Sequence, residues 1–255
     1  MTRRSAPRDW DAATYDRVSD PQFEWGLEVL ERLPLRGDET VLDAGCGSGR
    51  VTRALLERLP HGRVIAVDAA PAMVAVAREA LGDRAEVIEA DLVELELAEP
   101  VDAVFSSAVF HWVLDHDRLF ERVHAALRPG GRLVAQCGGE GNVERFLEAA
   151  SEAAAEPPFV AHLIGWTGPW NFPAPEETAA RLERRGFEGV RCWLEPRCAR
   201  PPDPRAYLTS ICLGCHVEQL PDDLHGPYVD AVLKRLGEPV EIDYVRLNVE
   251  ARRPA

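Results

Sequence analysis

The chain is poor in positive charge. It carries 29 lysine and arginine residues against 43 aspartate and glutamate residues, so its formal net charge is −14. A chain this acidic is not expected to bind nucleic acid as its main partner, because the phosphate backbone repels it. A small anionic substrate is compatible with this balance, since the local field of a pocket can differ from the net charge.

The sequence also lacks long apolar runs. No stretch approaches the ~18 apolar residues that a membrane-spanning helix requires, so we expect no membrane partner. The first ten residues, MTRRSAPRDW, have no apolar run behind their arginines, so we expect no secretory signal. A cytoplasmic location is therefore expected, where the six cysteines would be mostly reduced.

The order of apolar and polar segments is typical of an α/β protein. A length of 255 residues allows one large domain with a substantial insertion. Up to about residue 138, short apolar runs alternate with helical periods, which favours a parallel sheet. The predicted strands are 40–44, 63–68, 85–90, 101–106, 131–137, 190–194 and 244–250. The predicted helices are 20–33, one after Gly49, 71–81, 117–127, 142–155 and 175–185.

Residues after about 138 are read as insertions into this domain. Prolines and glycines mark a long irregular stretch between residues 157 and 175, and a mostly helical piece covers roughly 203–236. That piece is expected either over the carboxyl ends of the strands, where α/β sheets bind ligands, or on the far side of the sheet. We expect one domain over 1–255, with a core at 38–138 and insertions at 140–236.

The decapeptide VLDAGCGSGR, residues 41–50, places three glycines directly after a short apolar strand. Glycines at a strand-to-helix turn allow a tight bend and leave no Cβ between the backbone and a ligand. A purely structural turn rarely needs Gly45, Gly47 and Gly49 together. The dinucleotide fingerprint G-x-G-x-x-G would require its third glycine at position 50, where Arg50 stands, which counts against a pyrophosphate cofactor.

Two acids follow at the ends of the next strands. Asp68 ends the second predicted strand, where a carboxylate can accept both hydroxyls of a ribose; its alternative role is to cap the helix that begins at Pro71. Asp91 ends the third predicted strand and could accept from an adenine amino group, with Leu92 against the ring face. The order of these acids behind the glycine turn predicts a nucleoside-containing ligand.

These residues together resemble a known family. The pattern D-x-G-x-G-x-G at 43–49, Asp68, the Ala-Asp pair at 90–91 and LRPGGRLV at 127–134 resemble the class I S-adenosylmethionine-dependent methyltransferases over about 38–138. The segments FSSAVFHWVLDH, WDAATYDRVSDPQFEWG and DYVRLNVEARRP are similar to the trans-aconitate methyltransferase-like group.

The resemblance implies a fold and a reaction. The fold is a Rossmann-like, mostly parallel seven-stranded sheet with the last strand antiparallel, helices on both faces and a helical insertion over the carboxyl ends of the strands. The reaction is methyl transfer from S-adenosylmethionine to a small molecule, expected to be O-methylation of an organic acid. An NAD(P)-dependent oxidoreductase and a non-catalytic cofactor-binding protein stay open as alternatives.

The same resemblance implies residue roles. The methionine part of the cofactor would lie against Asp43, Gly45, Gly47 and Gly49, the ribose against Asp68, and the adenine against Asp91 and Leu92. Ser106 and Ser107, at the end of the fourth strand, would lie near the sulfonium, and His111 and Trp112 are the catalytic candidates. Gln22 is a further cofactor contact, together with Tyr15; its alternative is a capping box with Ser19 at the start of the first helix.

The need for a base depends on the acceptor. A carboxylate nucleophile is already ionised at pH 7 and needs none. A hydroxyl or an amine would need proton removal, for which a histidine with a pKa near neutral is suited. His111 is therefore interpreted either as this base or as a packed structural residue. The aromatic loop 165–172 is likewise either a wall of the substrate pocket or an ordinary loop held by its tryptophans.

Two late features complete the predictions. The segment CLGCH, residues 212–216, matches the attachment pattern of c-type haem, but haem needs export and zinc needs further ligands, so we expect no metal. Cationic side chains of the late segment are expected to bind a substrate carboxylate in a bidentate way, unless they are solvated surface charge. These side chains are Arg197, Arg200, Arg205, His216 and Arg246.

Overall fold

A seven-stranded sheet organises the chain, as the computed structural model shows for residues 19–255. The sequence candidates Trp10 and Tyr15 lie outside these described residues. The strand order is β3-β2-β1-β4-β5-β7-β6. The strands are β1 Thr40–Ala44, β2 Arg63–Asp68, β3 Ala85–Glu89, β4 Val101–Ser107, β5 Leu127–Gly138, β6 Glu188–Ala199 and β7 Ile242–Arg252.

The sheet is parallel except at β7. Strands β3, β2, β1, β4 and β5 pair in parallel, and β7 runs antiparallel to both β5 and β6. This arrangement confirms the predicted fold class, with its last strand antiparallel. Strands β6 and β7 are longer than predicted. Their pairing continues to Ala199 opposite Ile242, whereas β5 leaves β7 at Gly138 opposite Arg246.

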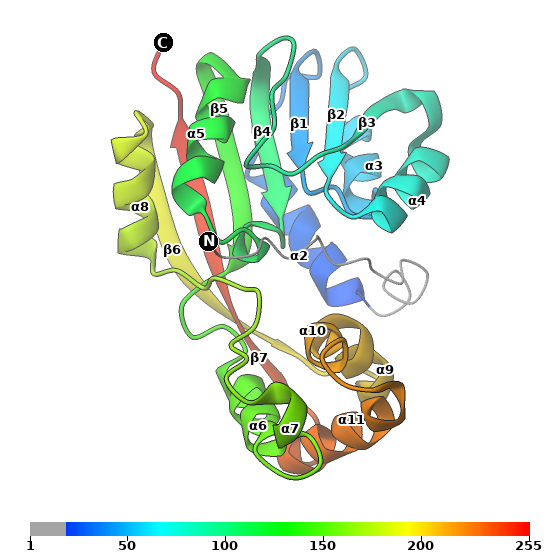
Figure 1. Cartoon of the computed structure of the whole chain (residues 1–255). Helices are drawn as coiled ribbons and strands as arrows, with labels where there is room; N and C mark the ends of the chain where they lie inside the picture. The colour runs from blue at the N-terminus through cyan, green and yellow to red at the C-terminus, as the bar shows by residue number, and fades with distance from the viewer. Residues whose placement is uncertain (1–18) are drawn as a thin grey trace.

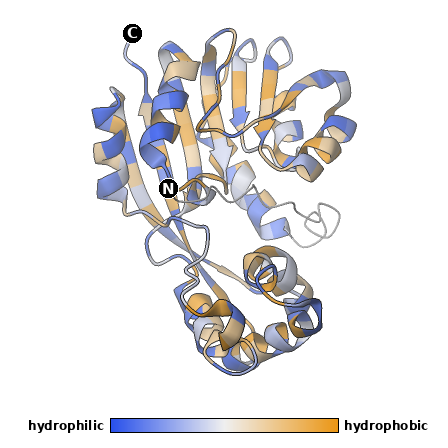
Figure 2. Ribbon diagram, in the orientation of Figure 1, coloured by the Kyte–Doolittle hydropathy of each residue, from blue (hydrophilic) through white to orange (hydrophobic). Residues whose placement is uncertain are grey.

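Helices cover both faces of the sheet (Figure 1). Neighbouring strand residues point to opposite faces, so Val41 packs in one apolar cluster and Leu42 in another. Strand residues are mostly hydrophobic in Figure 2, whereas α5 and α8 carry hydrophilic outer sides. The Val41 face is covered by α2 Asp20–Glu31, α3 Arg50–Glu57 and α4 Pro71–Leu81, and the Leu42 face by α5 His116–Ala126 and α8 Pro175–Arg184.

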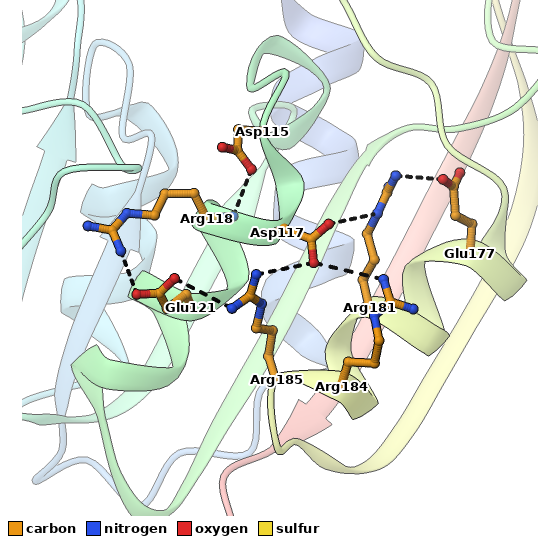
Figure 3. A network of polar contacts seen from close by, with 8 residues as sticks. All are labelled: Asp115, Asp117, Arg118, Glu121, Glu177, Arg181, Arg184 and Arg185. Atoms are coloured by element: carbon orange, nitrogen blue, oxygen red, sulfur yellow. Dashed lines mark hydrogen bonds and ion pairs between the residues drawn. The ribbon is translucent and has the colours of Figure 1, made fainter.

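Polar contacts join the two helices on the Leu42 face (Figure 3). Asp117 of α5 lies 3.8 Å from Arg181 of α8 and 3.3 Å from Arg185, which directly follows α8. Arg185 also lies 3.5 Å from Glu121, which in turn pairs with Arg118 on its own helix. Exposed ion pairs contribute little one by one, but a shared network orients α8 against α5.

The remaining helices form an apolar cluster of their own, here called the helical lobe, beyond the carboxyl ends of the parallel strands (Figure 1). The extended ends of β6 and β7 connect the sheet to this lobe. Tyr207, Leu208 and Tyr228 are buried at its centre. The lobe contains α6 Glu144–Ala154, α7 Val160–Leu163, α9 Pro204–Tyr207, the π-helical turn Leu208–Cys212, α10 Gly214–Val217 and α11 Asp222–Leu236.

One local prediction was wrong, and one element was not predicted. Ser19 precedes α2 but makes no side-chain cap, and Gln22 points away from the helix start to two tyrosine hydroxyls, so there is no capping box. Pro21 in the first turn of α2 needs no N–H partner, which leaves Gln22 available for tertiary contacts. The second difference is a short 3-10 turn, Phe110–Trp112, which follows β4 and which the pattern did not reveal. A further 3-10 turn, Gly82–Arg84, leads into β3.

Candidate active site

A large cavity lies between the carboxyl ends of the strands and the helical lobe. Its volume is about 1180 Å³, beyond the usual ~300–1,000 Å³ of a site for a single small ligand. Residues from the glycine turn line one half, and residues from α6, the aromatic loop, the 211–219 segment and β7 line the other. The cavity can therefore hold two ligands side by side. The late insertion meets the carboxyl ends of the strands, one of the two placements that its sequence allowed.

The glycine turn lies at the floor of the first half. The N–H groups of Gly45 and Cys46 both donate to the Val67 carbonyl, at 2.7 and 2.9 Å, and hold the turn against β2. Gly45 has φ +88°, and a Cβ there would lie 2.1 Å from Val109. Gly47 has φ +54° with nothing within 4 Å of a Cβ, so its backbone is open to a ligand. Gly49, also at positive φ, begins α3.

Asp43 is buried beneath this turn. Its Oδ2 accepts from the Thr52 hydroxyl at 2.6 Å. Burial raises the pKa of the Asp43 carboxyl to about 7, and the nearby Asp68 carboxylate adds to this rise, while the Thr52 bond opposes it. A buried carboxyl of this kind is suited to a cationic group, because a bound cation would favour its charged form.

Asp68 links the turn to the next helix. One of its oxygens accepts from the Gly47 N–H and the other from the Ala70 N–H, both at 2.9 Å. A carboxylate has about four acceptor positions, so these bonds leave room for a ligand hydroxyl. Burial raises the pKa of Asp68, and these backbone bonds oppose the rise. Asp68 thus orders the start of α4, as its alternative role predicted, and it also lines the cavity.

Asp91 and Leu92 lie in the loop that follows β3 and line the same half. The Val93 N–H donates to Asp91 Oδ1 at 3.0 Å, which fixes the carboxylate as the chain turns. Leu92 is buried against the strand core. Their positions fit a planar ring held between an acceptor and an apolar side chain.

The two serines at the end of β4 differ in position. Ser107 lines the cavity, whereas the Ser106 side chain is fully buried and donates to the Ala44 carbonyl at 2.6 Å. Side chains alternate along a strand, so these neighbours cannot face the same side. The prediction that Ser106 contacts the cofactor is therefore corrected: Ser106 ties β4 to β1. Ala108 follows at φ +62°, a strained conformation that turns the chain under the cavity.

His111 is buried at the boundary between the two halves. Its Nδ1 accepts from the Gly138 N–H at 3.3 Å. Burial, together with the charge of Arg246 and the neighbouring His116, holds the pKa of His111 well below its usual value. The ring is therefore neutral with its proton on Nε2. Of the two interpretations of His111, this geometry disfavours the proton-accepting base, because the ring offers a donor.

Trp112 and the aromatic loop close the second half. Phe172 stacks on His111 at 5.8 Å between centroids, and Trp170 meets Trp112 edge to face at 6.5 Å. The Asn171 N–H donates to the His111 carbonyl at 2.8 Å. These contacts attach the loop to the 3-10 turn after β4, and its rings line the cavity. The loop is a wall of the pocket.

Arg246 enters the second half from β7 and is only 2% exposed. Its Nε donates to Gln136 Oε1 at 3.4 Å, and its guanidinium lies 5.5 Å from the Trp25 ring centroid. Gln136 in turn donates to Asn248 at 2.8 Å. Arg246 was among the predicted cations, whereas its partner Gln136 and the neighbouring Asn248 were not predicted. Together they hold a buried cation in place.

The other predicted cations lie elsewhere. Arg197 pairs with Glu28 and Glu195, Arg200 with Glu241, and Arg205 with Asp230. None of the three lines the described cavity. The prediction that they face a substrate is therefore wrong, because each pairs with carboxylates outside the cavity.

Gln22 connects helix α2 to the helical lobe. Its Nε2 donates to the hydroxyls of Tyr207 at 2.7 Å and Tyr244 at 3.2 Å, and those hydroxyls lie 2.6 Å apart. Gln22 and Tyr244 line the cavity. A side chain of α2 thus reaches the lobe, which no local pattern predicts.

The CLGCH segment is divided between two environments. Cys212 and Cys215 line the cavity, whereas His216 packs among Trp166, Trp170 and other lobe rings. Burial lowers the pKa of His216 to about 4. Within residues 19–255, no group of three or more His, Cys, Asp or Glu side chains is arranged to hold a metal ion. None of the helices in that range has the length and apolar character needed to cross a membrane.

Comparisons with known proteins agree with this geometry. Residues 41–131 match the family model described as "Methyltransferase domain". The trans-aconitate 2-methyltransferase of Methylobacterium nodulans is 36% identical over 186 residues, 73% of this chain and 67% of that protein. The protein of the same name from Azoarcus sp. is 40% identical over 127 residues, half of each chain.

Among solved structures, phosphoethanolamine N-methyltransferase 2 of Haemonchus contortus, in complex with phosphomonomethylethanolamine and S-adenosylhomocysteine, has a TM-score of 0.65 and 20% identity. The match covers 96% of this chain and 57% of that one, and shows the shared fold. Fold, cavity and relatives together place this chain in the trans-aconitate methyltransferase group of the class I S-adenosylmethionine-dependent methyltransferases.

Proposed function

We propose that the chain transfers a methyl group from S-adenosylmethionine to a carboxylate of a small organic acid. The observation that carries the proposal is the position of Arg246, a buried cation in the half of the cavity opposite the glycine turn. The relatives named for trans-aconitate methylation support an acid as acceptor. We expect the partner in this reaction to be a small-molecule acceptor in the cytoplasm.

The residues of the first half fit the cofactor. Asp43 would face the ammonium of the methionine part, Gly47 would let the backbone approach it, and the free acceptor positions of Asp68 would receive the ribose hydroxyls. Asp91 and Leu92 would hold the adenine, and Ser107 would lie toward the sulfur. When bound, S-adenosylmethionine supplies a methyl group on a positively charged sulfur.

Arg246 and the His111 Nε2–H would orient the acceptor. The guanidinium of an arginine binds a carboxylate in a defined plane, and the imidazole N–H would add a hydrogen bond from a second direction. The transfer forms a bond from a carboxylate oxygen to the methyl carbon while the carbon–sulfur bond breaks. No proton moves, because the acid is already ionised. The task of the protein is thus alignment and exclusion of water, which Trp112 and the aromatic loop support.

The cofactor half is tested by Asp68→Ala. Loss of hydrogen bonds to a charged, buried group should weaken binding of S-adenosylhomocysteine by roughly 1.5–3 kcal/mol. Isothermal calorimetry measures this change, and an unaltered dissociation constant would refute the ribose assignment.

The acceptor half is tested with labelled cofactor and pairs of acids and their neutral amides. We expect methyl transfer to acids only, and loss of most of kcat/KM in Arg246→Gln while S-adenosylhomocysteine still binds. Equal turnover of acid and amide, or transfer only to amines or macromolecules, would remove the organic-acid assignment.

A further inference from the structure

We infer that Asn142 determines substrate specificity in the acceptor half: its side-chain amide binds a carboxylate of the acid other than the one that is methylated. This inference deepens the proposed function and rests on it. It comes from the way the turn after β5 orients Asn142 and from the space that Gly138 leaves for its amide.

The turn that follows β5 is bound to β7 on both sides of Asn142. The Gly139 N–H donates to the Val245 carbonyl at 3.0 Å, and the Val143 N–H donates to the Asp243 carbonyl at 2.8 Å. Val143 has φ +52°, which is costly for a β-branched residue and persists only where the surrounding structure imposes it. The backbone of Asn142 is therefore fixed by its neighbours on the sheet.

One hydrogen bond decides which way the amide of Asn142 points. The Val245 N–H donates to Asn142 Oδ1 at 3.0 Å. Because an N–H needs an acceptor, the amide oxygen faces Val245, and the donor Nδ2 points away from it. Within residues 19–255 no group accepts from Nδ2, and this nitrogen is not sealed inside the protein. Its N–H groups are therefore available to a ligand.

Gly138 makes room for this amide beside Arg246. A Cβ at position 138 would lie 2.7 Å from Asn142 Nδ2 and 2.7 Å from the Phe172 ring, so a side chain there would displace them. Gly138 is paired with Arg246 across β5 and β7, and paired residues point to the same face of a sheet. Nδ2 therefore lies over the face from which Arg246 enters the cavity, and Asn142 lines that cavity.

The polar side chains of this half are spread too widely for one carboxylate. Tyr244 and Arg246 both line the cavity and share a face of β7, two residues or ~6.8 Å apart along the strand. In the proposed function Arg246 and His111 orient the carboxylate that reacts, so Asn142 is placed for another one. Trans-aconitate, after which the relatives are named, carries three carboxylates. An acid with more than one carboxylate therefore fits this half.

The direct test is Asn142→Asp, which keeps an oxygen for the Val245 N–H and replaces the donor by a negative charge. The acids are trans-aconitate, succinate and octanoate, assayed with saturating labelled cofactor. For the better of the two polycarboxylates we expect KM to rise at least ~10-fold and kcat to stay within ~3-fold, because repulsion replaces a hydrogen bond to a group that does not react. An unchanged KM, or a fall in kcat as large as the rise in KM, would overturn the inference.

Ser151→Asp is the matched control. It adds the same charge on α6, where Ser151 is exposed and does not line the cavity. Its KM should stay within about twofold of the natural value, because an exposed charge is screened by water and salt. Calorimetry with S-adenosylhomocysteine should give an unchanged dissociation constant for both variants, which shows that they are folded. An equal rise of KM in Ser151→Asp would contradict the role of Asn142.

Failure of this inference can be told from failure of the proposed function. Methyl transfer to octanoate alone would refute the inference and leave the proposed function intact, because that acid has no second carboxylate. Transfer to none of the three acids, by a protein that binds S-adenosylhomocysteine, would refute the proposed function and the inference with it.

Discussion

The backbone N–H of Gly138 donates to Nδ1 of His111, and this bond decides which ring nitrogen carries the proton. With Nδ1 occupied as an acceptor and the pKa far below its usual value, the neutral ring keeps its hydrogen on Nε2. In this state the ring offers an N–H donor and has no vacant acceptor for the proton of an alcohol or an amine.

The first prediction follows from this tautomer. At saturating cofactor, kcat/KM for an acid acceptor should not change between about pH 6 and about pH 8, since neither a carboxylate nor His111 titrates there. His111→Phe should lower kcat/KM roughly 10-fold by removing one hydrogen bond to a charged group, with the cofactor dissociation constant unchanged. If kcat/KM instead rises with pH on the acidic side in the natural protein, and this rise disappears in His111→Gln, the ring acts as a base.

The second prediction concerns Asp43, whose pKa is about 7 in the ligand-free protein. Below that pH the carboxyl is neutral, so the cofactor ammonium loses its counter-charge. The dissociation constant of S-adenosylhomocysteine should therefore rise as pH falls below about 7, by up to ~10-fold per pH unit. Asp43→Asn should bind weakly with no such pH dependence. Calorimetry at several pH values measures both, and parallel curves for the two proteins would contradict the assignment.

The third prediction follows from the same raised pKa. Between the ordinary pKa of 3.8 and about 7 the folded protein holds a proton that the unfolded chain has lost, so this group makes the protein less stable as pH rises through that window. Asp43→Asn removes the titration and can still accept from Thr52. At pH 8 the ligand-free variant should be at least as stable as the natural protein, as measured by urea unfolding. If Asp43→Asn is clearly less stable than the natural protein at pH 8, the charge of Asp43 does not destabilise the fold.

The fourth prediction separates two glycines of the turn. Gly45→Ala should cost about 2–5 kcal/mol of unfolding free energy, because positive φ costs ~1–2 kcal/mol and overpacking against Val109 adds ~1–3. Gly47→Ala should cost only ~1–2 kcal/mol, since its Cβ meets nothing. Its effect should instead appear as weaker cofactor binding. Unaltered cofactor affinity in Gly47→Ala would mean that the ligand does not approach this backbone.

The fifth prediction tests the bridge from α2 to the lobe. Gln22→Met removes the donor to Tyr207 and Tyr244 and should cost about 1–2 kcal/mol of unfolding free energy. Tyr207→Phe removes one of the same bonds from the other side, so the double variant should lose less than the sum of the two. If the losses of the two single variants add exactly in the double variant, the hydrogen bond between Gln22 and Tyr207 contributes no stability.

Local sequence patterns determined the framework of this protein. The alternation of apolar runs and helical periods, with the glycine turn after β1, predicted the parallel strands close to their observed bounds. Hydrophobic period and turn chemistry act over a few residues, so they can be recognised without the fold. Asp43, Asp68 and Asp91 were identifiable for the same reason, because they are attached to strand ends that meet at one edge of the sheet.

Contacts between distant segments decided the rest. The sequence does not distinguish Ser106 from Ser107. In the structure the pleat of β4 points Ser106 toward Ala44 and Ser107 toward the cavity. Arg246 could not be told from Arg205, since both are arginines in the late segment. Only the pairing of β7 with β5 buries Arg246 beside Gln136, whereas α9 turns Arg205 to Asp230 at the surface. Burial and electrostatics are properties of the assembled fold, so only the tertiary structure distinguishes the arginine that lines the cavity from those at the surface.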